Sequence, residues 1–197
     1  VVPRLPKFLA RHPALKLDLI LSDAFADLVE EGIDLALRIG EVTEAGLTAR
    51  RIGETRRATV AAPSYLKARG IPAHPRDLAD HDCVIYTRLA TGARWRFEGA
   101  GGAIDVDVDG RFRANNSEAV REAVLAGLGI GVVPVWLLGD EIARKKVRVL
   151  LPDFEPKRLP ISALRASRRF EPAKTRAAID FLAAEFRLDP LLSDYRA

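Results

Sequence analysis

The chain has 197 residues, of which 48% are hydrophobic and 29% are charged, and its formal net charge is +4. These values are typical of a globular protein that forms one large domain or two small ones, and no apolar run approaches the roughly 20 residues that span a bilayer. Cys83 is the only cysteine, so no disulfide can form within the chain, and we expect a cytoplasmic protein.

The chain contains no methionine, so we expect further residues before Val1 in the translated protein. The basic residues are scattered, which favours a solvated surface over a nucleic-acid groove.

The segment from Ala14 to Gly40 predicts a parallel β-α-β unit. Apolar residues alternate over 15–21, a short helix is expected over 24–31, and a second strand is expected over 34–39. The carboxyl ends of the strands in such a unit meet at one edge of the sheet, where ligands bind. The residues expected at that edge are Ser22, Asp23, Arg38 and Gly40.

The rest of the chain continues to alternate between strands and helices, which is typical of an α/β fold. Extended segments are predicted over 47–53, 56–62, 83–86, 93–99, 103–110, 111–114, 130–134, 147–151 and 160–166. Helices are predicted over 3–12, 63–69, 75–80, 116–127 and 135–143, and after Pro172.

Three short motifs resemble catalytic or ligand-binding signatures, but the residues and elements around them differ from those that the signatures require. The aspartates of 105–109 match the start of a calcium loop, but its twelfth position is Asn116 instead of glutamate, so we expect an exposed acidic strand. The glycines of 127–131 follow a helix and precede a strand, the reverse of a dinucleotide fingerprint, so we expect a helix C-cap. Neighbours in a strand point to opposite faces, so His81-Asp82-Cys83 does not predict a catalytic triad. We expect no enzyme activity, no metal and no cofactor.

Asn115-Asn116-Ser117 is the polar site that the residues alone favour most. It precedes the helix of 116–127, and Asn115 and Glu118 have the spacing of a capping box. The free N–H groups of a helix N-terminus attract a carboxylate or a similar anion. A simple N-cap without a ligand explains the same residues equally well, so both alternatives stay open.

Several segments together resemble the effector-binding domain of LysR-type transcriptional regulators. They occur in that family's order and cover nearly the whole chain. They are FLARHPALKLDLILSD, DLVEEGIDLALRIG, LTARRIG, VAAPSYLKARG, HPRDLADHDCVIY, WRF, NNSEAVREAVLAGLGIGVVP and FLAAEF.

The resemblance implies a fold similar to that of type II periplasmic binding proteins. In that fold two α/β subdomains are joined by two crossover strands and hold a small molecule in their cleft. Subdomain I would comprise residues 1–60 and 164–197, and subdomain II residues 61–163. The crossovers would lie near Ala58–Ala62 and Ile161–Arg165.

The resemblance also implies which residues face the effector. They are Ser22, Asp23, Arg38, Ile39, Gly40, Asn115, Asn116, Ser117, Val132, Val133, Pro134 and Arg165. Two arginines, hydroxyls, amides and apolar walls suit a small anionic or hydrogen-bonding ligand. Structural roles stay open beside this one, since Ser22 is also suited to cap the helix of 24–31 and Arg38 to pair with a surface carboxylate.

Family members carry an N-terminal winged helix-turn-helix, a linker helix and a first strand of subdomain I, none of which matches a segment here. We therefore expect DNA binding only through a domain missing from this chain, and no membrane partner. The family pairs these domains side by side, so we expect a homodimer in which helix 3–12 meets helix 116–127, with Val124 exposed at the interface, and a tetrameric parent protein.

A different class of protein has the same two-lobed fold. An extracytoplasmic solute-binding receptor of a transporter would also hold a small molecule without changing it. A signal peptide upstream would support the receptor, and a helix-turn-helix would support the regulator. A hydrolase or isomerase on this scaffold would need a titratable pair in the cleft, and the sequence offers no obvious one.

Overall fold

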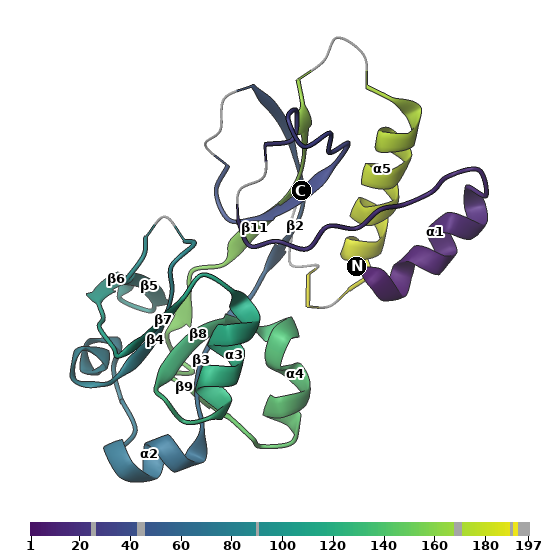
Figure 1. The fold of residues 1–197 in the computed structure, drawn as a ribbon. Helices are drawn as coiled ribbons and strands as arrows, with labels where there is room; N and C mark the ends of the chain where they lie inside the picture. The colour runs from purple at the N-terminus through teal and green to yellow at the C-terminus, as the bar shows by residue number, and fades with distance from the viewer. Residues whose placement is uncertain (25–26, 43–45, 90, 168–170, 190, 193–197) are drawn as a thin grey trace. The chain divides into compact units, whose positions relative to one another are not determined.

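The computed structural model describes residues 1–24, 27–42, 46–89, 91–167, 171–189 and 191–192 (Figure 1). The chain divides into two compact units. Unit 1 comprises Val1–Thr55 and Leu159–Ala197, and unit 2 comprises Arg56–Arg158. The subdomain boundaries predicted after residues 60 and 163 lie a few residues further along the chain than these divisions.

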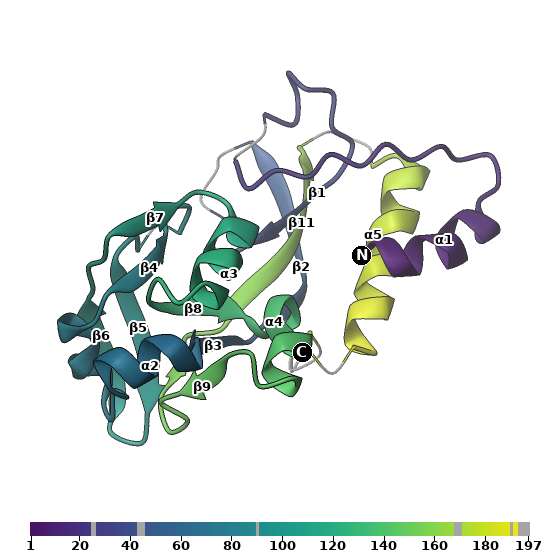
Figure 2. The ribbon, with the colours of Figure 1, turned by 60° about the horizontal axis from the view of Figure 1, so that its bottom comes forward.

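Unit 1 is built on a three-stranded antiparallel sheet in the order β1-β11-β2. Helix α5 contacts β2 of this sheet, and α1 lies beside α5 in Figures 1 and 2. The elements are η1 (Val2–Arg4), α1 (Leu5–Arg11), β1 (Ala36–Ile39), β2 (Leu47–Thr55), β11 (Leu159–Ala166) and α5 (Ala173–Arg187).

The core of unit 1 lies between one face of this sheet and the two helices. The Phe8 ring of α1 lies 5.1 Å from the Phe181 ring of α5, measured between centroids. Ile161 and Ala163 of β11 are buried in the same cluster, and Leu37 of β1 packs against it. Burying these apolar side chains stabilises the unit by roughly 25 cal/mol for each Å² removed from water.

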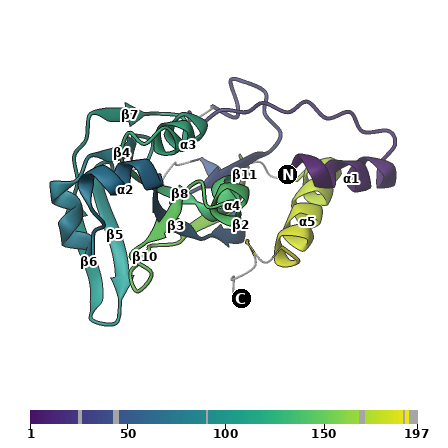
Figure 3. The same ribbon diagram turned by 90° about the horizontal axis from the view of Figure 1, so that it is seen from below.

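Unit 2 contains a five-stranded mixed sheet in the order β7-β4-β8-β3-β9 and a smaller antiparallel sheet in the order β10-β5-β6. Figure 2 shows α3 beside β8, and Figure 3 shows the β5–β6 hairpin. The strands are β3 (Arg57–Ala61), β4 (Cys83–Tyr86), β5 (Arg94–Gly99), β6 (Gly102–Asp107), β7 (Phe112–Ala114), β8 (Ile130–Pro134), β9 (Arg148–Leu150) and β10 (Glu155–Pro156). The helices are α2 (Pro63–Arg69), η2 (Pro75–Asp80), α3 (Ser117–Leu125) and α4 (Val135–Ala143).

The β5–β6 hairpin explains the acidic run that resembled a calcium loop. Asp105 and Asp107 lie opposite Arg96 and Arg94 in register, and each aspartate forms a two-point ion pair with its arginine. Val106, between the two aspartates, is buried in the core. The predicted exposed acidic strand is confirmed.

The glycines after α3 close the helix, as predicted. Gly127 has φ +78° and its N–H donates to the Val124 carbonyl, while the N–H of Leu128 donates to the Ala123 carbonyl. This hydrogen-bond pair is a Schellman motif, whose left-handed residue is easiest for glycine. The chain then enters β8 directly.

The predicted strand over 15–21 is wrong for the described structure. Residues 15–22 form no strand, and β1 pairs antiparallel with β11 instead of taking part in a β-α-β unit. Leu17 and Leu19 remain partly exposed, and Leu21 is 84% exposed. Alternation of apolar residues fixes only which residues share a face, and a strand also needs a neighbour that takes up its hydrogen bonds.

The helix predicted over 24–31 is also wrong in its described part, which forms a single turn. Residues 25 and 26 lie outside the described chain. Asp27 Oδ1 accepts hydrogen bonds from the N–H groups of Val29 (2.9 Å) and Glu30 (3.0 Å). A side chain that takes up local N–H groups in this way competes with helix formation. Gly32, with φ +65°, lies at the end of this turn.

The predicted exposure of Val124 on helix α3 is wrong. Val124 is 0% exposed and packs in the core of unit 2 with Val120 and Ala123. The exposed residues of this helix include Glu118 and Glu122. An apolar helical stripe looks the same whether it faces its own sheet or a partner, and here it faces the sheet.

Candidate functional site

The predicted site residues divide between the two units. Ser22, Asp23, Arg38, Ile39, Gly40 and Arg165 lie in unit 1. Asn115, Asn116, Ser117, Val132, Val133 and Pro134 lie in unit 2.

In unit 1 the carboxyl end of β1 carries three of the predicted residues. Arg38 and Ile39 pair in register with Ser162 and Ile161 of β11. The N–H of Gly40 donates to the Pro160 carbonyl at 2.9 Å, and Gly40 is buried with φ +116°. This hydrogen bond holds the end of β1 against the start of β11, and the glycine permits the turn that leaves the strand.

Ser22 and Asp23 lie in the irregular stretch before the Asp27 turn. The Ser22 hydroxyl is exposed and accepts a hydrogen bond from the N–H of Ala24 at 3.0 Å. The hydroxyl therefore organises its own turn, but it caps no helix in the described part of 24–31. Asp23 is half-buried.

Arg165 lies away from the carboxyl end of β1. Residues paired across an antiparallel ladder share a face, so Arg38 points to the same face as its partner Ser162. Arg165 is three residues further along β11, an odd number, so its side chain points to the opposite face. Three residues of strand also separate them by about 10 Å along the sheet.

In unit 2 the ends of three strands gather polar groups at one edge of the sheet. Strand β4 runs parallel to both β7 and β8, so their carboxyl ends lie at the same edge. β7 ends immediately before Asn115 and Asn116, and β8 ends at Pro134. Ligands of open α/β sheets bind at such an edge.

Asn116 is the N-cap of α3. Its Oδ1 accepts a hydrogen bond from the N–H of Ala119 at 3.0 Å, while Asn115 precedes the cap and is exposed. The capping box predicted from Asn115 and Glu118 is thus placed one residue too early. The structure therefore shows a cap at Asn116, the remaining N–H groups of the first turn keep the partial positive charge of a helix start, and ligand binding here stays a prediction.

The end of β8 presents alternate side chains to different surroundings. Val133 is 1% exposed and packs in the core of unit 2. Val132 and Pro134 point to the other face and are half-buried. Of the three predicted residues, these two have side chains that are partly open to a ligand.

Two residues at the same edge were not predicted. Thr87 follows β4, and its N–H and hydroxyl both donate to the Ala114 carbonyl at the end of β7, at 2.8 and 3.2 Å. Arg57 pairs in register with Pro134, and its Nε donates to the Lys157 carbonyl at 3.0 Å. Burial lowers the pKa of Arg57 to about 10, so it is a cation at neutral pH. The sequence signal for Thr87 was the end of the strand predicted over 83–86.

The neighbouring residues His81, Asp82 and Cys83 have separate structural roles. His81 Nδ1 lies 3.1 Å from the Tyr65 hydroxyl, and Asp82 forms ion pairs with arginines of α2 and of the loop before β7. Cys83 is buried, which raises the pKa of its thiol to about 12. A thiol that stays protonated at neutral pH is a poor nucleophile. No cluster of three metal-ligating side chains occurs among the described residues.

The chain matches one family over most of its length. Residues 1–187 match the family model of the LysR substrate binding domain. The HTH-type transcriptional regulator PtxR of Pseudomonas aeruginosa is 36% identical over 183 residues, which are 93% of this chain and 59% of that protein. The regulator CrgA of Neisseria meningitidis serogroup C is 31% identical over 186 residues, 94% of this chain and 62% of that protein.

Solved structures of regulators have the same fold. The regulatory domain of CrgA from Neisseria meningitidis has a TM-score of 0.79 at 31% identity, covering 93% of this chain and 90% of that chain. Full-length AphB of Vibrio cholerae has a TM-score of 0.76 at 27% identity, covering 94% and 63%. This chain spans less than two thirds of the length of PtxR and CrgA. It belongs to the LysR substrate binding domain family.

Proposed function

We propose that this chain is the effector-sensing part of a LysR-type transcriptional regulator and binds a small molecule without changing it chemically. The family match over residues 1–187 carries this proposal. The edge of the unit 2 sheet supports it, because Thr87, Asn115 and Pro134 lie where an α/β sheet offers groups to a ligand.

The proposed effector is a small anion or a hydrogen-bonding molecule. The first turn of α3 and the cationic Arg57 favour negative charge at the unit 2 edge. Arg38 and the turn at Ser22 are the corresponding candidates in unit 1. Arg165 is left out of this set because it points to the other face of the β1–β11 ladder from Arg38.

Transcriptional control belongs to the same proposal. A ligand that binds two conformations with unequal affinity shifts their populations by that difference. DNA binding would come from a part of the parent protein outside this chain, as the greater length of PtxR and CrgA supports. We propose a cytoplasmic location on this basis. No helix in the described ranges is both long and apolar enough to cross a membrane.

Self-association is also proposed, without the apolar contact through Val124. Homodimer pairing of α1 and α3 would have to use their exposed residues, since the apolar stripe of α3 is already buried. The alternative of a transporter's solute-binding receptor is disfavoured, because the relatives that match are transcriptional regulators.

A thermal-shift screen of small carboxylates, aromatic acids and amino acids tests the proposed function. A ligand at about 100 times its dissociation constant adds roughly 2.7 kcal/mol to the free energy of unfolding. Arg38→Ala and Thr87→Val should each reduce the shift. Arg11→Ala, an exposed change at the end of α1, should leave it unchanged. A stabilising ligand whose effect survives both site variants would contradict the proposed site.

A further inference from the structure

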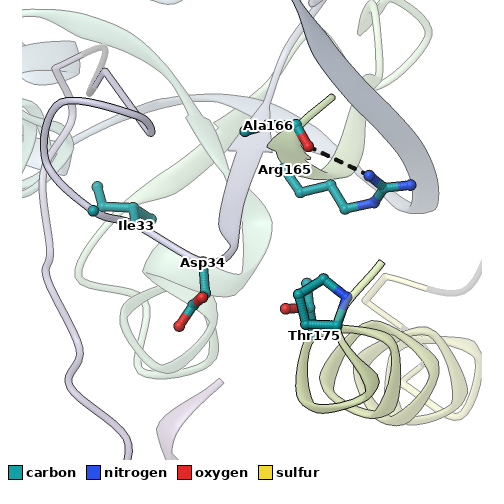
Figure 4. A pocket seen from close by; sticks show the side chains of 7 residues that line it. Ile33, Asp34, Arg165, Ala166 and Thr175 are labelled. Atoms are coloured by element: carbon teal, nitrogen blue, oxygen red, sulfur yellow. Dashed lines mark hydrogen bonds between the residues drawn. The ribbon is translucent and has the colours of Figure 1, made fainter. Parts of the chain in front are cut away.

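A small cavity in unit 1 lies at the end of β1 opposite to Gly40. It has a volume of about 40 Å³ and is lined by residues that include Asp34, Arg165, Pro172 and Thr175. Figure 4 shows Asp34, Arg165 and Thr175 around the cavity. Asp34 precedes β1, whereas Gly40 follows it, so this cavity is separate from the effector residues proposed at the carboxyl end of the strand.

Thr175 supplies the observation that points to a ligand. The residue is 3% exposed, and its hydroxyl has no hydrogen-bond partner among the described residues. Figure 4 shows Thr175 across the cavity from Asp34, and the hydroxyl oxygen itself is buried. A buried hydroxyl without a partner is costly, so it is expected to meet a ligand or a bound water.

The surrounding charges favour an anion over water. The N-cap of α5 is Pro172, whose side chain cannot cap the helix, and the N–H groups of Thr175 and Arg176 both donate to its carbonyl. The N–H groups of Ala173 and Lys174 therefore have no acceptor within the helix. They give this 15-residue helix a positive first turn beside the cavity.

The two nearby carboxylates are already neutralised by cations. Asp34 binds Lys174 at 2.5 Å. Glu171 accepts from Arg176 at 2.9 Å and from Arg165 at 3.0 Å, and these bonds lower the pKa of Glu171. Three cations against two carboxylates leave one positive charge around the cavity.

We propose that this cavity binds a single carboxylate group, held by the Thr175 hydroxyl, the Arg165 guanidinium and the first turn of α5. Arg165 uses Nε for Glu171 and Nη1 for the Ala166 carbonyl, and a guanidinium has five N–H donors. One water needs roughly 10–15 Å³ on the same measure, so the cavity has room for a group of a few heavy atoms such as a carboxylate, and the rest of a larger acid stays outside.

Formate is the probe, titrated into the 197-residue chain at constant ionic strength with chloride as the reference salt. Backbone amide signals of Ala173, Lys174 and Thr175 in ¹⁵N-labelled protein should shift and saturate. Thr175→Val keeps the side-chain shape and should weaken formate binding about tenfold. Thr175→Ser keeps the hydroxyl and should remain within about twofold. Thr91→Val, an exposed change in unit 2, is the matched control.

The melting temperature gives a second readout that does not depend on assigned signals. In chloride alone, Thr175→Val should be at least as stable as the unmodified chain, because it removes a hydroxyl without a partner. Formate should raise the melting temperature of the unmodified chain and of Thr175→Ser more than that of Thr175→Val. Unsaturable shifts, equal formate binding by Thr175→Val, or shifts confined to Arg38–Gly40 or Asn116 would overturn the proposal. A failed effector screen would leave it unaffected.

Discussion

At the scale of the residue, burial decides the chemistry of Cys83. The thiol is 1% exposed, and burial raises its pKa from 9.0 to about 12, with smaller contributions from Asp82 and Asp109. At a pH between these two pKa values, the thiol of the unfolded chain loses its proton, whereas the thiol of the folded chain keeps it. The free energy of unfolding therefore falls as the pH rises through this range.

The variant Cys83→Ala isolates this effect. We expect urea unfolding at pH 8 and pH 10 to show a smaller loss of stability for the variant than for the unmodified chain, because alanine has no proton to lose. Groups far from residue 83 contribute equally in both proteins and cancel in the comparison. Equal losses would show that the thiol is not shielded from water.

Asn116 and Asn115 are adjacent and both exposed, yet only Asn116 caps α3. Asn116→Ala should lower the free energy of unfolding by about 1 kcal/mol, because an N–H of the first helical turn loses its acceptor. Asn115→Ala should change it by less than about 0.5 kcal/mol. Urea titration of both variants checks this, and the reverse order would place the cap at Asn115.

At the scale of the element, α3 shows how one apolar stripe supports two interpretations. Val124 is fully buried among the side chains of unit 2. Val124→Ala should cost about 2 kcal/mol of stability by opening a cavity, and Val124→Glu should disrupt unit 2 because it buries a charge. Circular dichroism and urea unfolding measure both effects. A folded Val124→Glu chain with weaker self-association would restore the interface interpretation.

The elements that were predicted correctly from the sequence have ends that are set by residues within them or next to them. The strand over 83–86 and the helix over 63–69 match the structure because Pro63, Gly70 and the apolar runs set their ends locally. The segment 15–21 failed because pairing depends on a distant neighbour. The site was predicted in part for the same reason. Asn116 has a local capping signal, whereas Arg57 joins the edge only through its pairing with Pro134.

At the scale of the whole molecule, the stretch 15–22 contrasts with the paired sheet of unit 1. It belongs to no strand, whereas β2 and β11 pair along nearly their whole lengths. Amides of Leu17 to Leu21 should exchange with solvent hydrogen within seconds to minutes at neutral pH, and those of Ala163 and Leu164 far more slowly. Hydrogen-exchange mass spectrometry resolves the two peptides. Slow exchange over 17–21 would show that this stretch is paired in solution.

The ends of unit 2 are tied together by Arg57. The guanidinium of its second residue donates to the carbonyl of Lys157, its last residue but one. A module whose entry and exit are this close can be inserted into a host chain, or removed from it, with little strain on the flanking polypeptide. Residues 56–158 are therefore the natural unit to exchange between members of the family. If a short glycine-rich linker replaces them, the two segments of unit 1, Val1–Thr55 and Leu159–Ala197, should still fold together.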